Sequence, residues 1–483
     1  QPYNSNLSIV SSLKGTEINF FRPIRKVKEL EVALNIKAVK RMDVNFPEIK
    51  FSYGKGFRGK FNAKPGALEG FLILGEKKQS ISILPGQITL IGSLEEFNIA
   101  NLPMPGETKN IGPKWVIRDL FIKKFNFSSA VLLDTTLDMQ PIRGGYVFSL
   151  LNRDFKGSIF SGNNSEDISI NLDYLKLNNF QDGEDKIFGT VYNFIKLPFN
   201  FSVDEFNFND LSYGHWKFKV IPEKKRLILS NLEGKYGKWG LKKQDSESRS
   251  SLSIIKTMLG WQSSLSTMIY SGSPDKAFKQ IGIDPLLSMK TIEIFPDVSW
   301  EGLPWEFSFK KIKGTVGLSV KNLIIDSNDN GIEAPENLLR LISIFNVTDT
   351  FKKVTSLNFS KLYKKGFSAD SLDGKLLITK EGIEVNEPLI FKSGSSQFKW
   401  TGNVLIDELE NYSDLNLQVV MTLPLREYLS AYALILGGPF TAGIVYIAGK
   451  AFKRNLDQIS SGKWTVKGKI EDPKTNFEGW FED

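Results

Sequence analysis

Apolar and polar residues alternate with a period of two over most of this chain, which is the spacing of a strand with one apolar face. Each alternating run is short and is followed by turn residues, for example Pro85-Gly86 or Pro222–Lys225, as in antiparallel meanders. The clearest runs are Phe199/Phe201/Val203, Phe206/Phe208, Trp216/Phe218/Val220, Leu227/Leu229 and Trp305/Phe307/Phe309. The pattern therefore predicts a mainly β protein.

One-sided strands of this kind fit two architectures. In a sandwich or a small barrel, the apolar faces meet and fill a core. In a long antiparallel sheet that curls into a trough, the apolar face lines a groove instead. Alternation alone leaves both architectures open, and it does not tell which face points inward. The candidate groove residues are Phe199, Phe201, Phe206, Phe208, Trp216, Phe218, Phe307 and Phe309.

Helical patterns are few and occur late in the chain. Ser251–Gly272 and Ser273–Ile283 are predicted to form a short helical pair, and Asn337–Val354 an amphipathic helix that follows Pro335. A third helical region covers residues 425–459. We place the domain boundary near Ile283, so that residues 1–283 form a strand-rich part and residues 284–483 a mixed C-terminal part.

Composition and charge exclude several function classes. The 483 residues contain 62 Lys+Arg and 54 Asp+Glu, and the net charge of +8 is spread over the whole length instead of forming a basic stripe. No nucleic-acid-binding motif accompanies this charge, so no nucleic-acid partner is predicted. The chain has no Cys, which excludes disulfides, thiolate metal sites and Cys nucleophiles.

No set of residues indicates catalysis or a resident metal. His215, the single His, lies in an alternating run without a nucleophile motif beside it, so a structural role is the simpler interpretation. The segment that begins at Asp326 matches a calcium loop at its first positions, but Asn337 stands where the bidentate Glu is required. We therefore predict no enzyme activity, no catalytic residue, no metal and no cofactor.

Four blocks of sequence in the second half carry a family resemblance. They are PDVSWEGLPWEFSFKKIKGTVGLSVKNLIID (296–326), LLRLISIFNVTDTFKKVTSLNFSKLYKKGFSADSLDGKLLI (338–378), the segment around GGPFTAG (437–443) and ISSGKWTVKGKIEDP (459–473). In this order they resemble the C-terminal region of the YhdP branch of the AsmA-like proteins of Gram-negative bacteria. The resemblance is strong over residues 284–473 and weaker over residues 84–283. The last block departs from the family pattern, with Lys469-Ile470 where the family tends to carry Trp.

The resemblance implies a fold and a function. Such proteins resemble bridge-like lipid transfer proteins, in which a long curled β-sheet forms an apolar groove across the periplasm. It implies that phospholipid moves between the inner and outer membranes and that the outer-membrane permeability barrier is thereby maintained. Because the N-terminal inner-membrane helix of such proteins is not in this chain, we expect the distal part of a longer protein. A scaffold that assists outer-membrane protein biogenesis and a polysaccharide-binding module are the alternative roles.

Residues 428–449 form an uncharged stretch that, as a helix of about 33 Å, could span a bilayer. The Gly437-Gly438-Pro439 sequence in its middle argues against one straight helix. We expect a broken helical hairpin, Leu425–Leu436 and Phe440 to about Ile459, that contacts the outer-membrane leaflet at the distal end of the groove; a helical plug on the sheet is the alternative. The candidate membrane-contact residues are Leu434, Ile435, Leu436, Gly437, Gly438, Pro439, Phe440, Ile444, Val445 and Tyr446.

Overall fold

A computed structural model gives the fold of the chain. It describes residues 5–19, 24–42, 44–75, 81–98, 113–127, 130–162, 168–177, 192, 195–209, 211–243, 250–282, 288–308, 311–325, 367–394, 396–406, 412–424, 459–469 and 474–482. These residues hold 27 strands, the helix α2 and a 3₁₀ turn. The mainly β class predicted from the sequence is confirmed.

The chain divides into two compact units, Gln1–Pro222 and Glu223–Asp483, which we call unit 1 and unit 2. The boundary predicted near Ile283 falls inside unit 2. There β19 (Met268–Ser271) and β20 (Ser288–Glu301), which lie on either side of residue 283, pair with each other and belong to one sheet.

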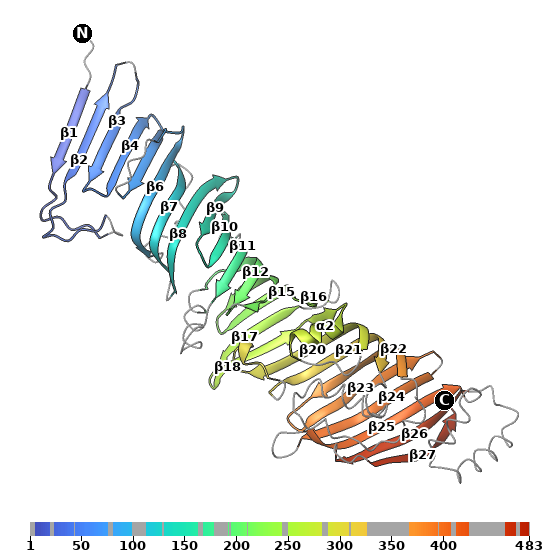
Figure 1. Cartoon of the computed structure of the whole chain (residues 1–483). Coiled ribbons are helices and arrows are strands. Elements are labelled where there is room, and N and C mark those ends of the chain that lie inside the picture. Colours follow the sequence, from blue (N-terminus) through green and yellow to red (C-terminus); the bar gives the residue numbers. More distant parts are fainter. Residues whose placement is uncertain are drawn as a thin grey trace, which may run out of the picture. The chain divides into compact units, whose positions relative to one another are not determined.

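Unit 1 is a ladder of strands in which neighbours in sequence lie side by side (Figure 1). Because the ladder is built strand after strand, its long direction runs across the strands, and the strand ends form its two long edges. The strands are β1 (Ser5–Ser11), β2 (Leu34–Lys40), β3 (Glu48–Tyr53), β4 (Phe57–Lys64), β5 (Ala67–Leu74), β6 (Gln87–Asn98), β7 (Lys114–Phe127), β8 (Ala130–Ile142), β9 (Gly145–Leu151), β10 (Phe155–Gly162), β11 (Ile168–Leu177), β12 (Phe199–Phe208), β13 (Leu211–Ser212) and β14 (His215–Glu223).

Three strand pairs in unit 1 are parallel, namely β5–β6, β6–β7 and β11–β12. The alternation predicts an antiparallel sheet, and these pairs depart from it. A parallel neighbour requires a connection that returns along the whole strand, and the connections 75–86, 99–113 and 178–198 supply the necessary length. The end of the first connection is fixed by Gly86, whose N–H donates to the Glu69 carboxylate at 3.2 Å.

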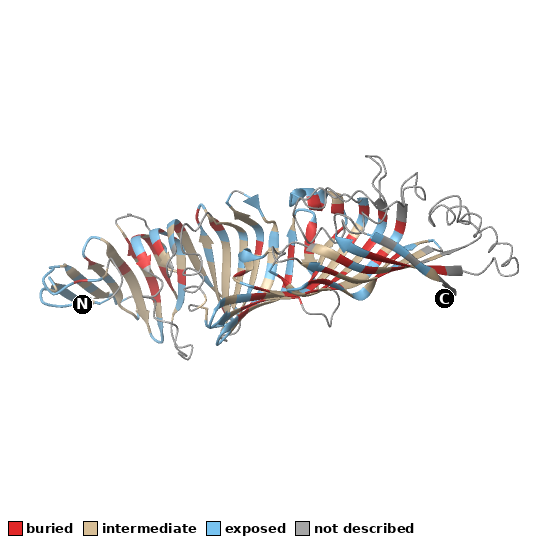
Figure 2. Cartoon of the chain, turned by 90° about the horizontal axis from the view of Figure 1, so that it is seen from below, coloured by how far each residue is buried: buried red, intermediate tan, exposed pale blue. Residues whose placement is uncertain are grey.

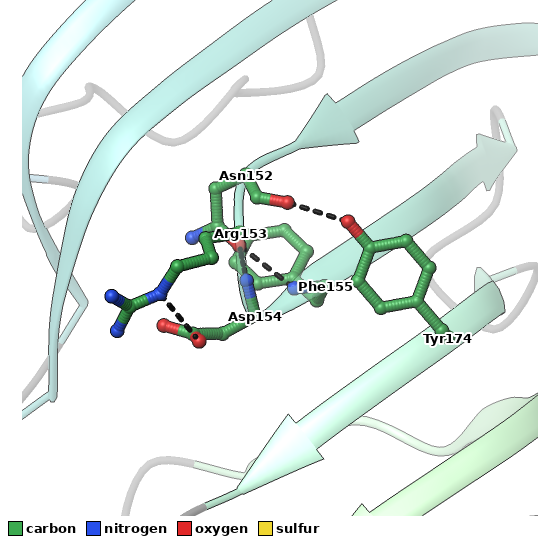
Figure 3. A network of polar contacts seen from close by, with 5 residues as sticks. All are labelled: Asn152, Arg153, Asp154, Phe155 and Tyr174. Atoms are coloured by element: carbon green, nitrogen blue, oxygen red, sulfur yellow. Dashed lines mark hydrogen bonds and ion pairs between the residues drawn. The ribbon is translucent and has the colours of Figure 1, made fainter.

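The tight turn between β9 and β10 shows how one side chain closes a hairpin (Figure 3). The Asn152 side-chain oxygen accepts the backbone N–H groups of Asp154 and Phe155, each at 2.7 Å. The Asn152 carbonyl oxygen accepts the Tyr174 hydroxyl at 2.6 Å, and Arg153 forms an exposed ion pair with Asp154 at 3.3 Å. Asn152 thereby replaces the hydrogen bonds that the turn removes from the ladder.

Unit 2 is a second ladder, and all strand pairs given for its described residues are antiparallel. β15 pairs with β16 and with β17, while β20 pairs with β18 and with β19. The elements are β15 (Arg226–Tyr236), β16 (Trp239–Lys242), β17 (Ser251–Thr257), β18 (Gly260–Ser266), β19 (Met268–Ser271), α2 (Pro274–Gln280), β20 (Ser288–Glu301), the 3₁₀ turn (Pro304–Glu306), β21 (Lys313–Ile325), β22 (Phe367–Ile378), β23 (Gly382–Ser393), β24 (Ser396–Ile406), β25 (Tyr412–Pro424), β26 (Ile459–Lys469) and β27 (Lys474–Glu482).

The helix predicted over Ser251–Gly272 is wrong, because this segment forms strands β17, β18 and β19. A hairpin turn at Met258-Leu259 joins the first two of these strands, and Thr257 pairs with Gly260 across it. The two apolar turn residues complete an apparent helical stripe in the sequence, although both side chains are fully exposed, at 99% and 101%. Tertiary pairing thus overrides the local pattern.

The other predicted helices have different outcomes. Within Ser273–Ile283 the structure forms the shorter helix α2, with Pro274 in its first turn. Asn337–Val354 and the predicted hairpin from Leu425 lie outside the described residues, except that Ile459 is the first residue of β26.

Candidate functional site: the apolar face of the sheet

Strand register assigns the side chains of unit 1 to two faces, because directly paired residues point to the same side of a sheet. Ile36 pairs with Phe51, and through successive pairings this side continues to Ile170 and Phe201. We call this side the unit 1 apolar face. Its members include Leu7, Ile9, Leu34, Ile36, Ile49, Phe51, Phe57, Phe61, Leu72, Leu90, Ile117, Leu137, Phe148, Ile159, Ile170, Leu172, Leu175, Phe201, Phe206, Phe208, Trp216 and Phe218.

Six of the predicted groove residues lie on this face. Phe199, Phe201 and Val203 of β12 pair with Val220, Phe218 and Trp216 of β14, respectively. The Phe201 and Phe218 rings stack with their centroids 5.0 Å apart. On the parallel side of β12, Leu175 and Leu177 of β11 pair with Phe206 and Phe208. The structure therefore brings these six candidates together on one surface.

A local irregularity keeps Phe206 and Phe208 on the same side as Phe201, although their positions differ in parity. Val203 pairs with Leu172, and Phe206 pairs with Leu175, so two residues intervene in each strand. In a regular strand, one residue separates two side chains of the same face. Here two residues separate them, and Phe206 therefore points to the apolar face like Val203. A strict period of two would have turned the later phenylalanines to the outer face.

Two glycines of the unit 1 apolar face lie beneath phenylalanine rings. A Cβ atom on Gly59 would come within 2.4 Å of the Phe51 ring, and a Cβ atom on Gly70 within 2.5 Å of the Phe61 ring. The Phe51 and Phe61 rings themselves are parallel to within 5°, with centroids 5.9 Å apart. The rings can cover the backbone because no side chain stands there, and they close the gap that each glycine leaves in the apolar surface.

The outer face of unit 1 is polar over most of the ladder. Lys50 and Asn200 are exposed there, next to Phe51 and Phe201 in sequence. Glu69 lies on this face as well, but it is only 5% exposed. The Lys64 ammonium at 2.7 Å, with Asn62 and the Gly86 N–H, holds the pKa of the Glu69 carboxyl below its usual value against the opposing effect of burial.

Apolar residues reach the outer face of unit 1 at β5, β6 and β7. Ile73, Ile91 and Val116 point outward and are 2%, 7% and 5% exposed. These are strands joined by parallel pairing, and the bond from Gly86 to Glu69 fixes the first returning connection at the outer face. The described end of this connection thus reaches the outer face at Gly86.

The unit 1 apolar face is only partly buried. Ile36, Phe51, Ile170 and Phe201 are all half-buried, and Leu7 is 59% exposed. A compact buried cluster interrupts this face at β5 to β7 and consists of Leu74, Leu94, Phe97, Leu120, Ile122 and Phe125. Ile88, Val203 and Val220 of this face are buried as well, at 2% to 3% exposure. Between these points, unit 1 presents apolar side chains that the described residues bury only in part.

One face of the unit 2 ladder is a core. Val320 and Leu323 of β21 are fully buried, and Leu372 of β22 and Val404 of β24 are each 1% exposed. These residues belong to one continuous hydrophobic cluster that runs from Trp239 to Val466. Figure 2 shows the contrast, with tan and blue dominant among the strands near the N-terminus and red concentrated among the strands of unit 2.

Helix α2 packs onto this core of unit 2. Phe278 meets the Trp239 ring edge to face, with the ring centroids 5.1 Å apart. The Trp239 indole N–H donates to the Ala277 carbonyl oxygen at 2.9 Å, so its polar atom is satisfied inside the core. α2 thus closes part of the apolar face with side chains of the chain itself.

The predicted strand through Trp305, Phe307 and Phe309 is wrong. Pro304 begins the 3₁₀ turn, the Leu303 N–H donates to the Glu306 carboxylate at 2.6 Å, and β21 begins only later. Proline fixes φ and lacks an N–H, which favours a turn over a ladder position. Phe307 is 41% exposed, and its ring meets the Trp300 ring edge to face with the centroids 5.3 Å apart. Phe309 lies outside the described residues.

The predicted membrane-contact residues, 434–446, lie outside the described residues. Within the described ranges, no helix has the length and apolar character needed to cross a membrane. Over the same ranges, no group of three or more His, Asp or Glu side chains is arranged to hold a metal ion.

Sequence reasoning missed the first five strands as part of the candidate site. A signal was present, since Leu34, Ile36 and Ala38 alternate with polar residues, as do Ile49 and Phe51. These runs are shorter and contain fewer aromatic residues than those of β12 and β14. Only the register shows that they share a face with Phe201.

Two comparisons with known proteins point to the same family. The family model described as YhdP protein matches residues 1–475. The intermembrane phospholipid transporter YhdP of Escherichia coli (strain K12) is 20% identical over 202 residues, which cover 42% of this chain and 15% of that protein. No solved structure matches. Since the family model covers almost all of its length, the chain belongs to the YhdP family.

Proposed function

We propose that the chain is part of a β-sheet groove that conducts phospholipid between the inner and outer membranes of a Gram-negative bacterium. The observation that carries the proposal is the unit 1 apolar face, which recurs on the strands from β1 to β14 and holds many half-buried apolar side chains on either side of the buried cluster at β5 to β7. The name of the Escherichia coli relative, an intermembrane phospholipid transporter, supports the same cargo. In this role the groove crosses the periplasm and maintains the outer-membrane permeability barrier.

The chemistry of this face suits acyl chains. Each CH₂ group moved from water onto an apolar surface gains about 0.8 kcal/mol. Contacts of this kind are non-directional, so an acyl chain can move along the face without breaking specific hydrogen bonds. The polar headgroup remains in water at the open side of the sheet. No catalytic residue and no cofactor are required, and we assign no enzyme activity to the chain.

The two membranes and the predicted hairpin complete the proposal. An N-terminal segment outside this chain would anchor the full-length protein in the inner membrane. Residues 434–446, which are apolar and flanked by Lys450 and Arg454, would contact the outer-membrane leaflet. Both contacts are expectations from the sequence and the family resemblance.

Lipid occupancy tests the proposal. The chain is purified from bacterial envelopes without delipidation, and bound lipid is quantified by mass spectrometry. We expect phospholipid in the wild type and a loss of about tenfold in the Phe201→Asp variant, because a carboxylate on the apolar face must be desolvated by an acyl chain. The matched control is Asn200→Asp, which adds the same charge on the outer face one residue away.

Two outcomes would contradict the proposal. One is a wild-type chain that carries no phospholipid and takes up none from vesicles. The other is equal lipid loss in Phe201→Asp and Asn200→Asp, which would show that lipid binding does not depend on the apolar face. A chain without lipid that instead co-purifies with outer-membrane proteins would favour the scaffold role, and one that retains glycan would favour polysaccharide binding.

A further inference from the structure

The hairpin turn between β17 and β18 exposes two large apolar side chains. Met258 is 99% exposed and Leu259 101%, the highest values among the large hydrophobic residues that the structure describes. A two-residue hairpin turn normally carries Asn, Asp or Gly, which suit its backbone and solvate well. The Met-Leu pair serves neither purpose, and it contributes nothing to the core.

The turn is held in a defined shape. The Thr257 hydroxyl accepts the Leu259 N–H at 3.2 Å and donates to the Gly260 carbonyl oxygen at 2.9 Å. Thr257 and Gly260 also pair with each other as the last residues of the ladder. The two apolar side chains therefore project from a fixed tip at one edge of unit 2.

Aromatic residues lie behind this tip on the same edge. Trp261 is the second residue of the return strand β18, and its carbonyl oxygen accepts the Gly302 N–H at 2.7 Å. The 3₁₀ turn that follows Gly302 carries Trp305, which is 52% exposed, and Phe307 comes directly after it. Tryptophan in such a position is characteristic of protein segments at membrane–water interfaces, where one end of the ring is apolar and the other wet.

Three lysines lie close to the tip, one on β17 and two in a neighbouring turn. The Lys256 ammonium lies 5.5 Å from the centroid of the Trp261 ring. Its backbone N–H donates to the Lys225 carbonyl oxygen at 3.0 Å, which places the neighbouring turn with Lys224 and Lys225 beside the hairpin. All three lysines are exposed, and none of them forms an ion pair with another described residue.

We propose that the Met258-Leu259 tip inserts into the surface of an anionic lipid leaflet, with Lys224, Lys225 and Lys256 contacting the headgroups. Apolar side chains at the end and cations behind them are complementary to the two layers of such a surface. Two side chains bury far too little area to bind a protein partner, because a specific interface buries about 800 Å² on each side. A leaflet accepts single side chains without a complementary shape.

This contact is independent of lipid conduction along the unit 1 apolar face, and it also differs from the predicted contact through residues 434–446. It would place the edge of unit 2 that carries β17 and β18 against a membrane. Because only two apolar side chains insert, the contact is weak and reversible, and it depends on salt through the lysines.

The absence of Cys permits a direct test with the full chain. Leu259→Cys is labelled with an environment-sensitive fluorophore and mixed with vesicles of phosphatidylethanolamine and phosphatidylglycerol (3:1). We expect a blue shift with an intensity gain of roughly threefold, since the probe enters an apolar layer. The gain should fall with pure phosphatidylcholine vesicles or in 0.5 M salt. The control Met42→Cys, also on an exposed apolar residue, should show no change.

A second measurement excludes an artefact of the label. Vesicle flotation of the Met258→Asp/Leu259→Asp variant should show affinity about tenfold weaker than that of the wild type, with the thermal unfolding midpoint unchanged because both side chains are exposed. Phe201→Asp should float like the wild type, which separates this contact from lipid conduction. The proposal is overturned if the labelled tip gives no spectral change, or if the double variant binds vesicles as the wild type does.

Discussion

Unit 1 and unit 2 contain the same kind of one-sided strand, yet their apolar faces differ. Ile170 and Phe201 in unit 1 are half-buried, whereas Leu372 and Val320 in unit 2 are at most 1% exposed. The unit 2 face belongs to one continuous cluster, onto which Phe278 of α2 packs. A period of two therefore specifies an apolar face, and what is packed against that face decides whether it is a core or a surface that can accept a ligand.

The largest effect should come from the core of unit 2. Leu372→Ala should lower the free energy of unfolding by about 3 kcal/mol, because the site is enclosed and leaves a cavity. Urea unfolding followed by tryptophan fluorescence measures this change. The control Leu405→Ala lies on the outer face of β24 at 41% exposure and should cost much less. Equal costs for the two variants would contradict the assignment of faces in unit 2.

The next effect concerns the glycines beneath the phenylalanine rings of unit 1. Gly70→Ala should destabilise the chain by about 2 kcal/mol, since the new Cβ would come within 2.3 Å of the Lys60 carbonyl oxygen as well as meeting the Phe61 ring. The same urea titration measures it. Gly272→Ala, with no atom within 4 Å of its Cβ, is the control. If both variants were equally stable, the Phe61 ring would not cover Gly70.

A smaller effect on stability is expected on the open face of unit 1. Ile170→Ala should cost about 1 kcal/mol in the delipidated chain, because the side chain is only half-buried and leaves no closed cavity. Unlike Leu372→Ala, it should also reduce the amount of lipid bound, which mass spectrometry reports. If Ile170→Ala lowered the free energy of unfolding as much as Leu372→Ala does and left the amount of bound lipid unchanged, the unit 1 face would be a core like that of unit 2.

The smallest effect should depend on pH. Glu69→Gln should cost about 1 kcal/mol at pH 7, because the Lys64 ammonium and the Gly86 N–H favour the carboxylate. Since the folded pKa of Glu69 is lowered, this contribution is complete above the unfolded pKa and disappears as the pH falls through the folded pKa. Urea titrations of both proteins between pH 7 and pH 3 should therefore converge at the acidic end. A difference that persists there would show that shape, and not charge, is the cause.

Part of this structure could be predicted from the sequence, because alternation reports directly on strands. The alternation predicts that Phe201, Phe218 and Trp216 lie on one-sided strands, and the register places them on one face. Alternation reports nothing about which strands become neighbours in parallel. The pairing of β11 with β12 depends on where the connection 178–198 returns, and no pair of residues in the strands encodes that path.

The wrong predictions share a physical cause. Met258 and Leu259 lie within the segment Ser251–Gly272 that the sequence predicts to be helical, because apolar residues in a turn are indistinguishable from core residues in a sequence. Phe307 was read as a strand residue, although Pro304 three positions earlier favours a turn. In both cases the apolar side chains are exposed in the fold, and only the structure distinguishes such residues from buried ones.

Photo-crosslinking at adjacent residues of β12 tests the central claim most directly. A photoreactive phenylalanine analogue replaces Phe201 on the apolar face in one protein and Asn200 on the outer face in another. After irradiation in living cells, mass spectrometry searches the purified protein for phospholipid adducts. The groove function predicts adducts at position 201 and few or none at position 200. Equal adducts at both positions, or none at position 201, would contradict it.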